Sequence, residues 1–122
     1  MFFGDVMGRA GRSAITNDLQ NLRLKYGADF VVINAENASS GLGLSAQHAI
    51  DILNAGADCI TLGDHAFDQK DMMQFIEKEP RIIRPLNFAK SAPGKGANIF
   101  SDLRGRKTVS YTHLRAHETT SD

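Results

Sequence analysis

The chain alternates between short, continuous apolar runs and longer segments whose apolar residues recur at helical spacing. The runs at residues 1–3, 30–33 and 59–62 predict three strands, because short unbroken apolar runs between turn signals are typical of buried strands. Residues 30–33 are rich in β-branched side chains, which favours a strand covered on both faces of a parallel sheet. Two further short strands are predicted at residues 81–85 and 97–100.

Three helices are predicted between these strands. They cover residues 13–26, the segment from Ser45 to Gly56, and the segment from Asp68 to the residue before Pro80. Ser13, Ser45 and Asp68 each carry a side-chain oxygen that can accept hydrogen bonds from first-turn amides, so each is expected to cap its helix. The glycine-rich segment at residues 4–12 is expected to be a loop between the first strand and the first helix.

The alternation of strands and helices predicts an α/β fold. It implies a mainly parallel sheet with right-handed crossovers and helices on its faces. In such sheets ligands collect beyond the carboxyl ends of the strands, so the residues that follow each predicted strand are the candidates for chemistry.

The amino-acid composition argues against some classes of binding partner. The chain has 122 residues, enough for one domain, and 14 basic residues balance 14 acidic ones. No stable nucleic-acid complex and no membrane partner are therefore expected, because the chain has no net field to recruit either. The single cysteine, Cys59, lies in an apolar run and cannot form an internal disulfide, which favours the reducing cytoplasm.

Polar residues follow all three leading strands. Asp5 follows the first strand, Glu36 and Asn37 follow the second, and Asp64 and His65 follow the third. A single such residue is commonly just a turn residue, and Asp5 or His65 alone would be interpreted that way. Carboxylate, amide and imidazole groups delivered by three consecutive strands are instead the donor set of a metal site with oxygen and nitrogen ligands.

Hydrolysis of a phosphate ester explains why these residue types would be needed together. Two metal ions held a few ångströms apart can polarise the phosphoryl group and generate a hydroxide nucleophile. Glu36 is suited to bridge the two ions, with Asp5 on one and Asp64 on the other. His65, next to Asp64, is suited to protonate the leaving oxygen.

Four segments in this order resemble a known family. They are Gly-Asp-Val-Met-Gly at residues 4–8, Asn-Ala-Glu-Asn-Ala at 34–38, Gly-Asp-His-Ala-Phe-Asp at 63–68 and Arg-Pro-Leu-Asn-Phe at 84–88. Over roughly residues 1–107 the chain resembles the YmdB-like family of bacterial calcineurin-type metallophosphoesterases. The resemblance implies a layered α/β sandwich, a pair of divalent metal ions, usually iron or manganese, and hydrolysis of phosphodiesters, including 2′,3′-cyclic nucleotides.

The resemblance also assigns roles to residues. It implies that Asp5, Glu36 and Asn37 are metal ligands and that His65 is the catalytic histidine. Asp64 stands where the family often has an asparagine ligand, and its extra negative charge could change metal preference.

The resemblance implies three further histidine ligands from a second half, and these have no counterpart here. The chain is therefore expected to be truncated: residues 1–108 form the N-terminal part of the phosphoesterase domain, and residues 109–122 are an artefactual, disordered tail without family match. His113 and His117 have zinc-motif spacing in that tail, but this is interpreted as a chance match.

Two alternatives to an active enzyme stay open: an inactive fragment, and a non-catalytic α/β module that binds one metal ion. The sequence also leaves the oligomeric state open. Arg9 and Arg12 lie in a glycine-rich segment that could bind phosphate, but without the Walker lysine this is weak evidence alone. His48 is expected to have a structural role.

Overall fold

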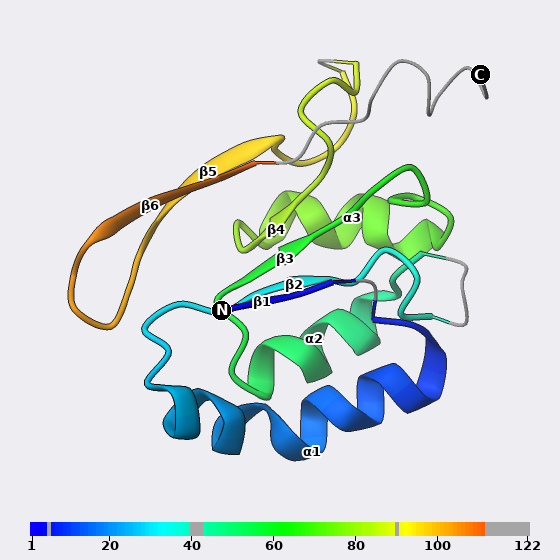
Figure 1. The fold of residues 1–122 in the computed structure, drawn as a ribbon. Helices are drawn as coiled ribbons and strands as arrows, with labels where there is room; N and C mark the ends of the chain where they lie inside the picture. Colours follow the sequence, from blue (N-terminus) through cyan, green and yellow to red (C-terminus); the bar gives the residue numbers. More distant parts are fainter. Residues whose placement is uncertain (5, 40–42, 90, 112–122) are drawn as a thin grey trace, which may run out of the picture.

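A computed structural model describes residues 1–4, 6–39, 43–89 and 91–111 of the chain (Figure 1). Its elements are β1 (Phe2–Phe3), α1 (Gly8–Tyr26), β2 (Val32–Asn34), α2 (Ala46–Asn54), β3 (Cys59–Thr61), α3 (Lys70–Lys78), β4 (Ile82–Ile83), β5 (Ala97–Ser101) and β6 (Lys107–Tyr111). None of the helices in the described ranges is long and apolar enough to cross a membrane.

The first four strands form one parallel sheet in the order β1-β2-β3-β4. This confirms the predicted mixed α/β fold with a parallel sheet. The register pairs Asn34 at the end of β2 with Thr61 at the end of β3. Consequently the segments that follow these two strands leave the sheet side by side.

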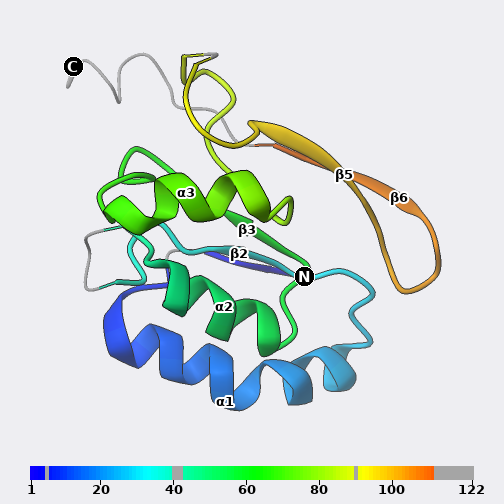
Figure 2. The same ribbon diagram turned by 180° about the vertical axis from the view of Figure 1, so that it is seen from behind.

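The three helices cover one face of the sheet, whereas the sequence predicted helices on its faces. Figure 2 shows α2 and α3 next to the strands and α1 beyond α2, and neighbouring helices are in contact. Strands added in sequence order by right-handed crossovers all place their helices on the same side, which explains this arrangement. The β5–β6 hairpin lies toward the other side, where Cys59 contacts Ser110 at 3.6 Å and Phe30 packs against Phe100.

The predicted start of the first helix was wrong. α1 begins at Gly8, five residues before Ser13, and Met7 stands at its N-cap. Gly11 was interpreted as a loop signal, but it lies inside the helix, where a Cβ would come within 3.0 Å of a methyl group of Val6. This glycine is required by close packing rather than by a turn. The predicted end is confirmed, because Gly27 adopts the left-handed conformation with φ of 60°.

The other two predicted caps have different outcomes. Ser45 caps α2 as predicted, and its hydroxyl accepts a hydrogen bond from the backbone N–H of His48. Asp68 does not cap α3, which begins at Lys70 after Gln69. The Asp68 carboxylate is instead bonded to His65, so it is not available to the helix amides.

β6 crosses the predicted domain boundary at residue 108. Val109, Ser110 and Tyr111 belong to this strand and pair with β5 in antiparallel register. Residues 112–122, including His113 and His117, lie outside the described residues. The predicted division of the chain into residues 1–108 and a disordered tail at 109–122 therefore stays a prediction, except that its first three residues are in a strand.

The core fills the space between the sheet and the helices. Its largest side chains with no exposed surface are Leu19, Ile33, Leu44, Ile52, Ile60, Leu62 and Met72. α1 contributes Ile15 and Leu19 at the predicted helical spacing. Burial of this apolar face is the main force that attaches the helices to the sheet.

We expect Leu19→Ala to reduce the free energy of unfolding by about 2–5 kcal/mol, because it leaves a cavity in this core. The measurement is urea unfolding followed by circular dichroism. Leu24→Ala on the same helix is the matched control, since Leu24 is 80% exposed and its truncation should change stability by only about 0.5 kcal/mol. Equal losses in the two variants would contradict the described packing of α1.

Candidate metal centre

The predicted site residues follow β2 and β3 at the carboxyl edge of the sheet. The two strand ends are joined by the bond from the Ala35 N–H to the Thr61 carbonyl at 3.0 Å and by the Asn34 amide to the Thr61 hydroxyl at 3.3 Å. Glu36 and Asp64 therefore leave the sheet from positions that are held together. Parallel pairing alone accounts for their closeness in space.

Gly63 makes room for the side chain of Glu36. A Cβ at position 63 would lie 2.0 Å from Glu36 Oε2 and 2.4 Å from its carboxyl carbon. No side chain can occupy that space without moving Glu36. The carboxyl group of Glu36 is thus packed on the backbone of the segment that carries Asp64 and His65.

Glu36 has the electrostatics of a ligand that needs a cation. Its Oε2 atom is buried and has no hydrogen-bond partner among the described residues. Burial, followed by the hydrogen bond and repulsion from Asp64, raises the pKa of Glu36, while the backbone N–H of His65 opposes this shift. Two neighbouring carboxylates with one buried, unpaired oxygen fit a divalent metal ion.

His65 lies beside these carboxylates and is held by Asp68. Its Nδ1 donates to Asp68 Oδ2 at 2.8 Å, and its Nε2 lies 3.9 Å from Asp64 Oδ1. The bond to Asp68, and then the charge of Asp64, raise the pKa of His65. Nε2 remains open to solvent, because the histidine side chain is 46% exposed. The imidazole is therefore oriented, accessible and able to exchange a proton near neutral pH.

Two other predicted ligands are described only in part. The backbone carbonyl of Asn37 accepts a hydrogen bond from the Gly8 N–H at 3.2 Å, which ties the end of β2 to the start of α1. Asp5 lies outside the described residues. Among the residues that the structure describes, no three Asp, Glu, His or Cys side chains are grouped as metal ligands. The described part of the site is thus Glu36, Asp64 and His65, with Asn37 adjacent.

Sequence reasoning missed two supporting residues. Asp68 was interpreted as a helix cap, although its position three residues after His65 was a usable signal for a side-chain pair. Arg84 begins the fourth motif, and its guanidinium is bonded to the carbonyls of Pro93 at 3.1 Å and Pro85 at 2.9 Å. This bonding fixes the loop after β4, which packs Phe88 against Phe67, two residues after His65.

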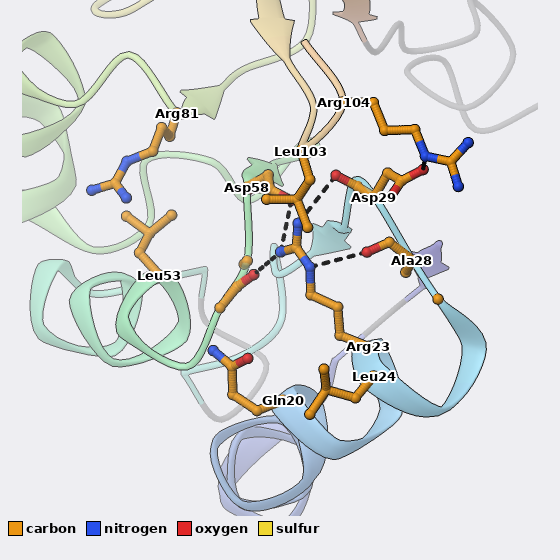
Figure 3. A pocket seen from close by; sticks show the side chains of 13 residues that line it. Gln20, Arg23, Leu24, Ala28, Asp29, Leu53, Asp58, Arg81, Leu103 and Arg104 are labelled. Carbon is orange, nitrogen blue, oxygen red and sulfur yellow. Dashed lines mark hydrogen bonds and ion pairs between the residues drawn. The ribbon is translucent and has the colours of Figure 1, made fainter. Parts of the chain in front are cut away.

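A pocket lies at the opposite edge of the sheet, away from these residues (Figure 3). Its volume is about 650 Å³, and Arg23 extends into its centre. Arg23 is fully engaged there, with bonds to the carbonyls of Ala28, Asp29 and Gly56 and an ion pair with Asp58 at 2.9 Å. These bonds join α1 to the loops before β2 and β3, so the role of Arg23 is structural.

The same fold is found in solved structures. The chain superposes on a hypothetical protein from Thermus thermophilus with a TM-score of 0.79 and 34% identity, covering 88% of this chain and 41% of that one. It superposes on a phosphatase from Mycoplasma pneumoniae with a TM-score of 0.74 and 42% identity, covering 81% and 37%. Both likenesses are close enough to show more than a shared architecture.

Sequence comparison gives the family. Residues 1–120 match the family model described as YmdB-like protein, so the match extends into the stretch at residues 109–122 that was expected to have no family match. The chain is 41% identical over 96 residues to the 2′,3′-cyclic-nucleotide 2′-phosphodiesterase of Bacillus subtilis (strain 168), covering 79% of this chain and 36% of that protein. It is also 41% identical to a putative phosphatase/phosphodiesterase of Mycoplasma pneumoniae, of which it covers 37%. The chain belongs to the YmdB-like family, and it spans little more than a third of the length of these relatives.

We expect Glu36→Gln to stabilise the metal-free chain at neutral pH. Because the folded-state pKa of Glu36 is raised, its contribution to stability is fully present below the ordinary value of 4.5 and is lost as pH rises through the folded-state value. The free energies of unfolding of wild type and variant should therefore diverge as the pH rises above 4.5, with the variant more stable at neutral pH. Urea titrations across this range are the measurement, and Asp18→Asn, an exposed change on α1, is the control. Parallel pH profiles would contradict the raised pKa.

We expect Asp68→Asn to lower the pKa of His65, because the bond to Asp68 is the largest cause of its raised value. An NMR titration of the imidazole C–H signals in the metal-free chain measures this directly. Asp71→Asn is the matched control, since that carboxylate accepts a hydrogen bond from the Ala46 N–H and does not contact His65. An unchanged pKa in Asp68→Asn would show that the bond to Asp68 does not hold the imidazole in solution.

Proposed function

We propose that this chain supplies the Glu36, Asp64 and His65 part of the active site of a metal-dependent phosphoesterase that hydrolyses phosphodiesters. The observation that carries the proposal is the buried, unpartnered Oε2 of Glu36 beside Asp64 at the carboxyl edge of the sheet. The Asp64 side chain is 64% exposed, so the unfavourable group is the buried Oε2 of Glu36, and a cation held between the two carboxylates would compensate it.

The residues of the candidate site would have different roles in phosphodiester hydrolysis. Glu36, Asp64, Asn37 and Asp5 would hold two divalent metal ions, which would supply Lewis-acid polarisation of the phosphoryl group and an activated water. His65 can donate a proton from Nε2 to the leaving oxygen, because Asp68 orients its ring and favours the protonated form. Asp68 acts through His65 and is a positioning residue.

Iron or manganese is the proposed metal pair. Carboxylate and amide oxygens with nearby imidazole suit both ions. Asp64 in place of a neutral amide adds one negative charge, which favours ions of higher charge at that position.

The proposed substrate class is a phosphodiester, including 2′,3′-cyclic nucleotides. This rests on the activity named for the Bacillus subtilis relative, of which the chain covers 36%. We also propose that the protein works in the cytoplasm, which the free, buried thiol of Cys59 supports. Burial raises the pKa of that thiol to about 11, so it is unreactive and compatible with a structural role.

Binding of manganese to the 122-residue chain tests the proposal. We expect Mn²⁺ to raise the thermal unfolding midpoint, because a ligand that binds only the folded state stabilises it by mass action. Glu36→Gln should abolish this rise. Glu77→Gln, which removes a carboxylate on α3 far from the sheet edge, is the control and should keep it. No stabilisation by Mn²⁺, or equal stabilisation of Glu36→Gln, would overturn the proposed site.

Hydrolysis of bis-p-nitrophenyl phosphate and of 2′,3′-cyclic AMP is the second readout. Weak turnover is expected, because the three further histidine ligands implied for the family have no counterpart in these 122 residues. Any Mn²⁺-dependent turnover should be lost in His65→Ala. Turnover that survives in His65→Ala would contradict the role assigned to this histidine.

A further inference from the structure

A second polar pocket lies between α1 and α2, next to the segment that leaves β2. Its volume is about 260 Å³. Six polar residues line it: Arg9, Arg12, Ser13, Thr16, His48 and Asp51. The four residues from α1 are spaced three, four and seven apart, so they share one face of that helix, and His48 and Asp51 share a face of α2. The pocket is therefore built by two rigid helices.

The two arginines of this pocket are not neutralised by other described residues. Within the described ranges, neither Arg9 nor Arg12 forms an ion pair with a carboxylate, whereas four other arginines do: Arg23, Arg81, Arg104 and Arg106. Arg12 is oriented by a hydrogen bond from Nη1 to the backbone carbonyl of Ala38. One edge of its guanidinium is thereby fixed, and its charge remains available to the pocket.

His48 contributes a hydrogen-bond donor to the pocket rather than a positive charge. Its Nδ1 lies 2.6 Å from the Ser39 hydroxyl, which already accepts the backbone N–H of Ser45 at 2.9 Å. The Ser39 hydroxyl hydrogen is thus available for Nδ1, and the imidazole hydrogen is then on Nε2. Burial, and next the charge of Arg12, lower the pKa of His48, which keeps the ring neutral.

Hydrogen bonds connect the helix that lines this pocket to the segment of the candidate metal centre. Arg12 is bonded to Ala38 and Gly8 is bonded to Asn37, so the start of α1 is attached to the residues directly after Glu36. A group bound by Arg9 and Arg12 would lie beside the metal centre without occupying it.

We propose that this pocket binds a phosphate group of the substrate other than the one that is hydrolysed. The proposal rests on the proposed phosphoesterase function and favours, among phosphodiesters, those that carry a second phosphate, such as oligonucleotide ends. Two arginines beside the hydroxyl of Ser13 are groups that recognise phosphate oxygens, often through two bonds from one arginine, whereas the Thr16 hydroxyl donates to the Ser13 carbonyl at 3.3 Å.

The carboxylate of Asp51 limits the negative charge of the ligands that the pocket can bind. Its carboxylate accepts a hydrogen bond from the Gln47 side chain at 3.0 Å and lies on the α2 side of the pocket. It repels a second phosphate from the pocket and can accept a hydrogen bond from a sugar hydroxyl. A single phosphate attached to a ribose therefore fits better than a polyphosphate.

NMR titration of the metal-free 122-residue chain tests this pocket. The two probes are inorganic phosphate and the 5′-phosphorylated dinucleotide pApA, each at constant ionic strength. Both should shift the side-chain signals of Arg9, Arg12 and His48 in a saturable manner. Arg9→Gln should weaken the binding of each probe about tenfold, as expected for the loss of a charge-assisted hydrogen bond.

Arg104→Gln is the matched control, because it removes the same charge from an exposed site near Asp29, and it should leave both affinities unchanged. Equal weakening in the two variants, or shifts centred on Arg23 and Arg104, would overturn the pocket. Binding of pApA no tighter than that of inorganic phosphate would show that the pocket takes free phosphate and overturn its role for the substrate. The titrations contain no metal. A negative result in them therefore bears on the phosphate pocket alone, whereas a negative result in the Mn²⁺ experiment bears on the proposed metal site.

Discussion

The candidate site depends on the close contact between the carboxyl group of Glu36 and the backbone of Gly63. Parallel pairing of β2 and β3 in the register Asn34 to Thr61 brings the two segments together, and the absence of a Cβ at position 63 lets the carboxylate reach the next segment. Every other described group at the site is placed relative to this contact, since Asp64 and His65 follow Gly63 directly. A side chain at position 63 would displace Glu36 and separate the groups.

This contact makes the metal-free fold electrostatically unfavourable at the same position. Burying Glu36 next to Asp64 disfavours its charged form, and one carboxylate oxygen finds no partner among the described residues. A bound cation would remove this unfavourable electrostatic free energy, because it offsets the repulsion between the two carboxylates and gives the unsatisfied oxygen a partner. The apolar core under α1 and α2 supplies the stability that tolerates this local cost. The residues that stabilise the fold thus lie between the helices and the sheet, whereas the residues of the candidate site lie at the edge of the sheet.

The sequence predicted the sheet well because its strands are unbroken apolar runs, and it predicted the neighbourhood of Glu36 and Asp64 because parallel strands end at one edge. It failed at Gly11, which signals a turn in sequence and serves close packing to Val6 in the fold. It failed at Asp68 for a related reason: a capping residue and a histidine partner have the same chemistry, and only the position of His65 decides between them. Both errors concern contacts made by tertiary structure, which local patterns do not contain.

The early start of α1 changes what its glycine-rich segment can do. In a loop, Arg9 and Arg12 would have no fixed relation to each other or to Ser13. In a helix that begins at Gly8 they stand on one face, and the bond from Arg12 to Ala38 attaches that face to the segment after Glu36. The glycine-rich segment lacks the lysine and serine of a Walker loop. In this segment phosphate would be recognised by side chains on a helix rather than by the backbone amides of a loop. The same segment that joins α1 to the metal centre would then also select which phosphoesters reach it.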